Sequence, residues 1–224
     1  MAQSGTQEQE RLLDEIRAEA WQTRQYTGRE AFDERVLAAL REVPREDFVP
    51  VELHHRAHDN RPLPIGHGQT ISQPYIVALM TDLIDPKPGD VVLEIGTGSG
   101  YQAAVLARLV KRVFTMDIIE ALAAQAAIRL QRLGYGNVEV RSGNGRLGWP
   151  EHAPFDAILV AAAARDIPPA LVAQLKPGGK LVIPVGDVRE SQELLVLSKD
   201  GRDRIHQRRV LPVVFVPLTG AAGD

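Results

Sequence analysis

The chain has 224 residues, of which 44% are hydrophobic and 25% charged, and this suits one large globular domain or a domain with an extension. Its net charge of -3 provides no basic footprint for nucleic acid, and no apolar run is long enough to cross a membrane. Because cysteine is absent, disulfides, thiolate metal sites and thiol nucleophiles are excluded. We therefore expect a cytoplasmic, monomeric protein without nucleic-acid or membrane partners.

The first part of the chain carries helical periodicity. Residues 1–8 are polar and are expected to fray. Two amphipathic helices are predicted from apolar positions at helical spacing: Leu12, Leu13, Ile16, Ala20 and Trp21, then Val36, Leu37, Leu40 and Val43. Arg45 and Glu46 are expected on the solvated side. We assign residues 1–62 to an N-terminal helical extension and residues 63–224 to the main domain.

Three histidines in the extension, His54, His55 and His58, raise the question of a metal site. Residues four apart on a helix share a face, which could place two imidazoles on one ion. No nearby cluster of carboxylates completes such a site, so surface or capping roles are favoured and no metal is predicted.

The segment 62–74 has the composition of a loop, with prolines, glycines, hydroxyls and amides close together. A helix is predicted over residues 75–84. Ser72 could cap this helix, with Pro74 in its first turn. Alternatively, Thr70 and Ser72 direct their hydroxyls at a substrate carboxylate near the helix N-terminus, where anions are favoured.

Beyond residue 90 the chain alternates between strand and helix patterns. Buried strands are predicted at residues 91–93, 155–160 and 180–185, and further strands at the apolar segment 112–116 and at the short segment 138–140. Helices are predicted at residues 102–109, 118–133 and 169–175, the last ended by Pro177, Gly178 and Gly179. Residues 192–197 and 210–215 are expected to form a late antiparallel pair. This order predicts an α/β fold: a doubly wound, mostly parallel sheet covered by helices on both faces, with an antiparallel edge.

A glycine-rich turn follows the strand that begins at residue 91. Its spacing is Gly96-x-Gly98-x-Gly100, preceded by Glu94. A dinucleotide fingerprint would need a glycine where Tyr101 stands, and a phosphate loop would need Lys followed by Ser or Thr. The spacing is typical of S-adenosylmethionine sites, although a purely structural glycine turn is the alternative.

Two further strand ends carry polar groups suited to a nucleoside. Asp117 closes the strand at residues 112–116, where a carboxylate can accept hydrogen bonds from two ribose hydroxyls. Asn144, between Gly143 and Gly145, offers an amide that can recognise a purine edge. Ligands of doubly wound sheets bind outside the carboxyl ends of the strands, where all these residues lie.

Taken together, four blocks in this order resemble the protein-L-isoaspartate O-methyltransferase family over residues 33–219. The blocks are residues 62–74, with Gly68-Gln69-Thr70-Ile71-Ser72-Gln73-Pro74, then 93–100, 148–157 and 181–186. The glycine block alone indicates a methyltransferase, whereas the block at residues 68–74 is close to a signature of this family.

The resemblance implies methyl transfer from S-adenosylmethionine to the free α-carboxylate of L-isoaspartyl residues in damaged proteins or peptides, with S-adenosylhomocysteine as product. Ser72 matches the family's active-site serine, and Thr70 is the second residue expected to act on the substrate. The residues expected to bind the cofactor are Gln69, Thr70, Ile71, Ser72, Glu94, Gly96, Gly98, Ser99, Gly100, Asp117, Gly143, Asn144, Gly145 and Thr219.

The chain departs from the family pattern in two places. Asn144 stands where the family usually has Asp. An amide oxygen accepts a hydrogen bond from the adenine amino group less strongly than a carboxylate does, so this replacement would weaken the interaction. The stretch 19–32 is longer than the usual link between the first two helices, so no role is carried over to it. Two other functions stay open: a related methyltransferase acting on another carboxylate or a small molecule, and a cofactor-binding module without turnover.

Overall fold

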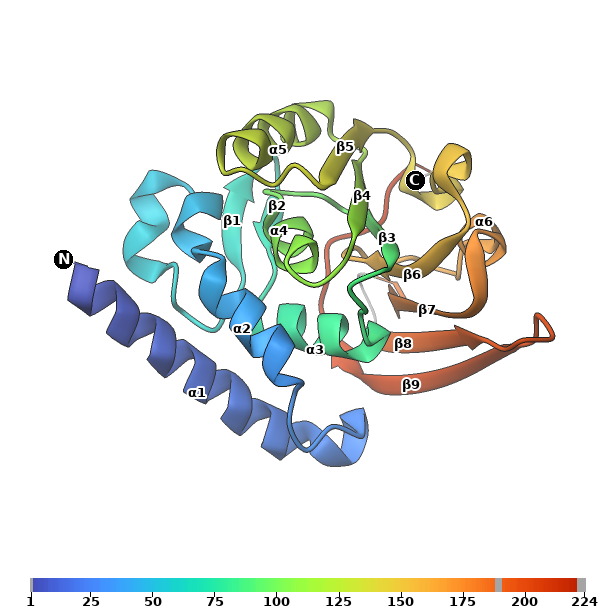
Figure 1. Ribbon diagram of the computed structural model, residues 1–224, viewed down its shortest axis with the longest axis horizontal. Helices are drawn as coiled ribbons and strands as arrows, with labels where there is room; N and C mark the ends of the chain where they lie inside the picture. Colours follow the sequence, from blue (N-terminus) through green and yellow to red (C-terminus); the bar gives the residue numbers. More distant parts are fainter. Residues whose placement is uncertain (1, 188–190, 221–224) are drawn as a thin grey trace.

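A seven-stranded sheet runs through the centre of the protein (Figure 1). The computed structural model describes residues 2–187 and 191–220. In order of pairing, the strands are β5 (Val138–Ser142), β4 (Arg112–Asp117), β3 (Val91–Ile95), β6 (Phe155–Val160), β7 (Leu175–Val185), β8 (Gln192–Lys199) and β9 (Ile205–Val213). The first five are parallel, whereas β8 and β9 pair antiparallel. The predicted doubly wound sheet with an antiparallel edge is confirmed, and its strand order reverses between β3 and β6.

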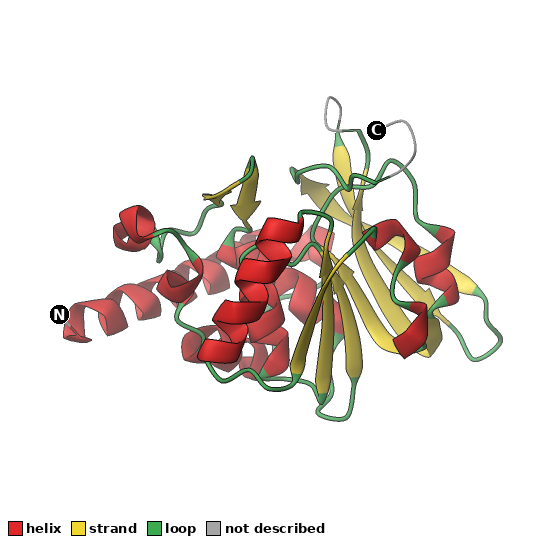
Figure 2. Ribbon diagram, turned by 90° about the horizontal axis from the view of Figure 1, so that it is seen from above, coloured by secondary structure: helices red, strands yellow, loops and turns green. Residues whose placement is uncertain are grey.

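Helices cover both faces of this sheet, as Figure 2 shows. Successive side chains of a strand point to opposite faces, so Val92 belongs to one core cluster and Leu93 to the other. The first cluster includes side chains of α3 (Pro74–Ile84), α4 (Tyr101–Ala107) and α5 (Glu120–Arg132). The second includes α6 (Pro169–Ala173) and the segment that holds η3 (Gly145–Leu147) and η4 (Pro150–His152). Burial on both faces explains the apolar runs of the central strands β3 and β6, whereas the outer strand β5 is only partly buried.

The N-terminal helices pack on the first of these clusters. α1 spans Ala2–Thr27 and α2 spans Glu34–Glu42, followed by η1 (Arg45–Phe48) and η2 (Val51–Arg56). α1 starts earlier than predicted, because residues 2–8 continue the helix instead of fraying. Trp21 is 54% exposed under the guanidinium of Arg24 and does not join the buried face. It stands about 140° around the helix from Ile16, which is fully buried.

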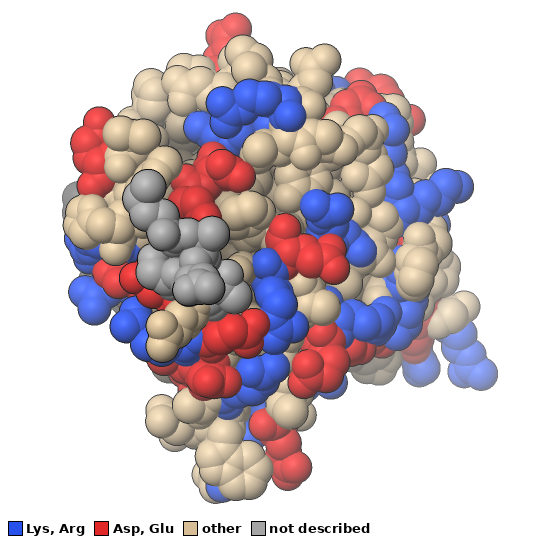
Figure 3. Space-filling view, turned by 60° about the vertical axis from the view of Figure 1, so that its left-hand side comes forward, with Lys and Arg blue, Asp and Glu red and all other residues tan. Residues whose placement is uncertain are grey.

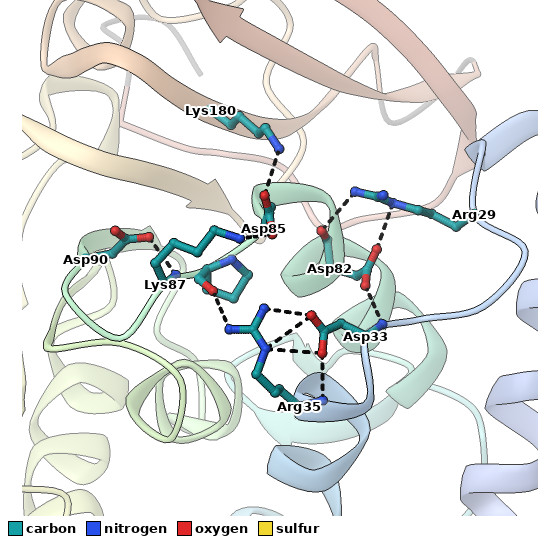
Figure 4. Close-up of polar contacts among 9 residues, drawn as sticks. Arg29, Asp33, Arg35, Asp82, Asp85, Lys87, Asp90 and Lys180 are labelled. Atoms are coloured by element: carbon teal, nitrogen blue, oxygen red, sulfur yellow. Dashed lines mark hydrogen bonds and ion pairs between the residues drawn. The ribbon is translucent and has the colours of Figure 1, made fainter.

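A buried carboxylate joins the extension to the rest of the protein (Figure 4). Asp82, near the end of α3, accepts a hydrogen bond of 2.8 Å from the Asp33 N–H and pairs with Arg29 Nε at 2.7 Å. Burial raises the pKa of Asp82, while the Asp33 N–H and the Arg29 charge oppose that shift. The loop between α1 and α2 is therefore tied to α3. The boundary predicted at residue 62 stays a prediction.

The segment expected to be a loop forms a hairpin instead. β1 (Leu63–Gly66) pairs antiparallel with β2 (Gln69–Ile71). His67 and Gly68, at the turn, have φ of 53° and 70°, and such left-handed residues suit a tight turn between twisted strands. The hairpin lies against the glycine turn, since a Cβ at Gly98 would be 3.2 Å from Ile65 Cδ1.

Two strand boundaries also differ from the prediction. β7 begins at Leu175, so Pro177, Gly178 and Gly179 lie inside the strand rather than ending α6. A Cβ at Gly179 would come within 2.8 Å of the Asp156 carbonyl oxygen, which shows how closely the two backbones approach there. β9 begins at Ile205 instead of residue 210, because an edge strand tolerates the polar residues 206–209 on its exposed surface.

The surface mixes charges of both signs. On the face shown in Figure 3, acidic and basic side chains alternate, and neither kind gathers into a large patch. None of the helices in the described parts of the chain combines the length and the apolar character that a membrane crossing requires.

Candidate functional site

The site is built around the glycine turn between β3 and α4. Gly96 and Gly98 have φ of 97° and 52°, which residues with a Cβ rarely adopt. The Gly96 N–H donates to the Met116 carbonyl at 2.7 Å, and the Gly98 N–H donates to Asp117 Oδ2 at 2.8 Å. These bonds hold the turn against the end of β4. Gly100, by contrast, packs against Leu130, whose Cδ1 would lie 3.1 Å from an added Cβ.

Two small cavities open beside this turn. The turn cavity, of about 70 Å³, brings together seven of the predicted residues: Gln69, Thr70, Gly96, Gly98, Asp117, Gly145 and Thr219. The Glu94 cavity, of about 40 Å³, is lined by seven: Thr70, Ile71, Ser72, Glu94, Gly96, Gly98 and Ser99. The hairpin, the glycine turn and the C-terminal segment therefore meet at the carboxyl ends of the parallel strands, where the site was predicted.

Glu94 is fully buried and incompletely hydrogen-bonded. Its Oε2 accepts a bond of 2.6 Å from the Thr115 hydroxyl, and Oε1 has no partner among the described residues. Burial raises the pKa of Glu94 to about 8, which the Thr115 bond only partly opposes. An ionised Glu94 would thus be stabilised by a cation at Oε1.

Asp117 is held in place by the backbone on either side. Its Oδ2 accepts from Gly98 N–H and its Oδ1 accepts from the Ile119 N–H at 2.9 Å. Each carboxylate oxygen can accept more than one hydrogen bond, so the group can also bind a ligand hydroxyl in the turn cavity.

A larger cavity adjoins Ser72 on the other side. This groove, of about 410 Å³, is lined by Thr70, Ser72, Gln73, Tyr75 and Ile76, by Glu19 and Pro62, by Ala161, and by residues 211–216. Ser72 lines both the groove and the Glu94 cavity, and Thr70 and Ala161 line all three cavities. A ligand in the groove can therefore meet a ligand beside the glycine turn at Ser72.

Ser72 does not cap α3. The N-cap is Gln73, and Pro74 occupies the first helical turn as predicted. The Ser72 carbonyl accepts a bond of 3.0 Å from Arg45, which is 1% exposed and also donates to the carbonyls of Ala57, Asp59 and Arg61. The prediction that Arg45 faces solvent is wrong, because its guanidinium supplies donors for backbone that the fold buries.

Asn144 and Gly143 line none of these three cavities. The Asn144 side-chain amide donates to the Gly220 carbonyl at 2.6 Å, and its Oδ1 accepts from the Arg146 N–H at 3.0 Å. Asn144 thus fastens the C-terminal segment that brings Thr219 to the turn cavity. Its role toward an adenine stays a prediction.

Several residues of the site were not predicted from the sequence. They are Glu19, residues 211–216 and the buried Arg45. Glu19 is one of several charged residues in α1, and the residues next to it in the sequence do not indicate a place in the site. Ala161, by contrast, directly follows the strand predicted at residues 155–160, where ligands of doubly wound sheets are expected to bind.

Comparison with known proteins identifies the family. A family model for protein-L-isoaspartate(D-aspartate) O-methyltransferase matches residues 19–223. The chain belongs to this family. It is 59% identical over 209 residues to protein-L-isoaspartate O-methyltransferase 2 of Polaromonas sp. strain JS666, covering 93% of this chain and 99% of the relative. The protein-L-isoaspartate O-methyltransferase 2 of Nitrosococcus oceani is 57% identical over 209 residues, which cover 93% of this chain and 95% of the relative.

Solved structures of the family share the fold. One protein-L-isoaspartate O-methyltransferase superposes with a TM-score of 0.79 at 27% identity, covering 95% of this chain and 66% of that longer one. A protein from Plasmodium falciparum, described as a putative member bound to S-adenosyl-L-homocysteine, gives a TM-score of 0.73 at 27% identity, with 84% and 91% covered. The family and fold implied by the sequence blocks are confirmed.

Proposed function

We propose that this protein transfers a methyl group from S-adenosylmethionine to the free α-carboxylate of L-isoaspartyl residues in damaged proteins and peptides. The observation that carries this proposal is the position of Ser72, which lines both the groove and the Glu94 cavity. The reaction needs such a meeting point, because the carboxylate oxygen must reach the methyl group directly. Family membership supports the choice of reaction.

The residues beside the glycine turn fit S-adenosylmethionine. Glu94 presents a buried carboxylate oxygen without a partner in the described residues, which suits the ammonium group of the ligand's amino-acid end. Asp117 would accept from the ribose hydroxyls, and Gly96 and Gly98 would let the ligand approach the backbone. When bound, S-adenosylmethionine supplies a methyl group on a positively charged sulfur, and S-adenosylhomocysteine is the product.

The substrate carboxylate needs no general base. With an ordinary pKa of roughly 3.5, it is already ionised at neutral pH. Ser72 and Thr70 would donate hydrogen bonds that orient the carboxylate, and Ile71 would help to exclude water. Positioning of reacting groups contributes up to ~7–11 kcal/mol in well-oriented systems. His67 is exposed at the hairpin turn and lines none of the three cavities, so no proton transfer is assigned to it.

The deciding experiment is methyl transfer from labelled S-adenosylmethionine to a synthetic isoaspartyl peptide, measured beside the same peptide with normal aspartate. We expect transfer to the isoaspartyl form alone. Transfer to neither peptide, with S-adenosylhomocysteine binding intact by calorimetry, would overturn the substrate assignment and leave the cofactor assignment standing.

We also propose that the protein works in the cytoplasm as a monomer, with isoaspartyl-containing proteins as its partners and without nucleic acid or membrane. The net charge of -3 and the mixed charges on the face shown in Figure 3 support the part of this proposal that excludes a nucleic-acid partner.

A further inference from the structure

α1 contributes an acidic side chain to the groove. Glu19 is partly buried and lines the same cavity as Ser72. Its Oε2 accepts a bond of 2.8 Å from the Asn60 amide, and both of its oxygens accept from the Gln73 amide, at 3.1 and 3.3 Å. Gln73 directly follows Ser72, so the carboxylate lies close to the point at which the substrate would react.

Glu19 has no cationic partner within the described residues. Its hydrogen-bond donors are neutral amides, and no Lys, Arg or His described in the structure forms an ion pair with it. Glu15 is the charged neighbour that influences it, and Glu15 is also acidic; burial is the main cause that raises the pKa of Glu19. Among the residues that the structure describes, no positive charge therefore balances Glu19.

None of the described residues that line the groove is cationic. Residues 211–216 are Leu, Pro, Val, Val, Phe and Val, and Ile76 also lines the groove. An apolar wall reduces the screening of a nearby charge. A cation that enters the groove with a substrate would thus interact with Glu19 more strongly than on an open surface, and an anion would be repelled.

We propose that Glu19 makes the groove selective for isoaspartyl peptides that carry a lysine or arginine close to the isoaspartyl residue, over peptides with an acidic residue there. This inference rests on the proposed function and assigns a specificity role to α1. A partly screened charge pair of this kind corresponds to a roughly 3- to 10-fold difference in kcat/KM.

The test uses a matched set of isoaspartyl peptides that differ only in one residue near the isoaspartyl position, which is Lys, Gln or Glu. The substitution is placed in turn on each side of the isoaspartyl residue. kcat and KM are measured for the full-length wild type, for Glu19→Gln and for the charge reversal Glu19→Lys. Glu8→Gln, the same change at an exposed position of α1, is the control, and thermal unfolding checks that each variant is folded.

We expect the wild type and Glu8→Gln to prefer the Lys peptide over the Glu peptide, mainly through KM, for at least one placement. Glu19→Gln should lose this ratio, and Glu19→Lys should invert it. The inference would be overturned if the Lys-to-Glu ratio of kcat/KM were equal in the wild type and Glu19→Gln, or if the wild type showed no preference. In either case, methylation of the Gln peptide would still uphold the proposed function. Methylation of none of the peptides would overturn both.

Discussion

At Glu94, burial and an incomplete set of hydrogen bonds act on one carboxyl group. The side chain is fully buried, its Oε2 is bonded to Thr115, and its Oε1 has no partner among the described residues. With its pKa raised to about 8, the group is mostly protonated at neutral pH in the absence of a ligand. A ligand cation next to Oε1 would favour loss of that proton.

We expect Glu94→Gln to change how the stability of the ligand-free protein depends on pH. The folded state keeps the Glu94 proton up to about pH 8, whereas the unfolded chain releases it near the ordinary value of 4.5. Between these values the unfolded state binds fewer protons, so the free energy of unfolding falls as pH rises. At about 1.4 kcal/mol per pKa unit, the loss is on the order of a few kcal/mol. Gln cannot ionise and removes this loss.

Thermal unfolding of both proteins without cofactor, between about pH 5 and about pH 9, measures this effect. The wild-type melting temperature should fall more steeply with rising pH than that of the variant. If the melting temperatures of the wild type and of Glu94→Gln changed in parallel with pH, the raised pKa of Glu94 would be contradicted.

Ser72→Ala tests the hydroxyl at the meeting point of groove and Glu94 cavity. The substitution leaves the Ser72 carbonyl in place for its bond to Arg45, so the backbone keeps its anchor. We expect kcat with an isoaspartyl peptide to fall roughly 10- to 100-fold, as for the loss of one positioned donor. Calorimetry should show S-adenosylhomocysteine binding close to that of the wild type. Unchanged turnover would remove Ser72 from the proposed mechanism.

At the scale of elements, Arg45 connects three segments. It lies at the start of η1, bonds the carbonyls of residues 57, 59 and 61 after η2, and bonds Ser72 after the hairpin. Burial lowers its pKa to about 10, so the group stays charged at neutral pH. Two guanidinium nitrogens of Arg45 donate to these four carbonyls, whereas a lysine would have to serve them from a single nitrogen with three donors.

We expect Arg45→Lys to lower the free energy of unfolding by at least ~2 kcal/mol, because buried carbonyls lose their donors. Urea denaturation followed by circular dichroism measures the change. Arg11→Lys, at a side chain that is 63% exposed, serves as control and should stay within about 0.5 kcal/mol of the wild type. Equal stability of Arg45→Lys and Arg11→Lys would contradict the role of this buried guanidinium.

At the scale of the whole molecule, the turn cavity joins segments that are far apart in the chain. Its lining runs from Gln69 of the hairpin through the glycine turn to Thr219. A ligand bound there stabilises the folded state as a unit, since the unfolded chain has no such cavity.

We expect S-adenosylhomocysteine at about 100 times its Kd to stabilise the protein by ~2.7 kcal/mol, which corresponds to a rise in Tm of roughly 5–10 °C for a chain of this size. Differential scanning fluorimetry measures the shift. NAD is the control, and it should leave Tm unchanged, because Tyr101 stands where a dinucleotide site would have its third glycine. A shift with NAD and none with S-adenosylhomocysteine would overturn the cofactor assignment.

Local pattern predicted the parts of the fold that depend on nearby residues. The strand-to-helix turn at Gly96 to Gly100 was predicted because backbone bends and close approaches demand glycine in a fixed spacing. The hairpin at residues 63–71 was missed, since its composition is that of a loop and the left-handed turn at His67 has no strong signature. The start of β9 was predicted too late, because a strand at the edge of a sheet tolerates polar residues that do not follow an alternating pattern.

By itself, the sequence determined the sheet type, the glycine turn and the family blocks, because periodicity and spacing act over a few residues. The tertiary structure alone decided that Arg45 is buried, that Glu19 reaches the groove and that residues 211–216 form its wall. These placements depend on contacts between segments distant in the chain, such as Glu19 with Gln73. Whether a single polar residue is buried depends on the segments that pack around it, and the residues next to it in the sequence do not reveal those segments.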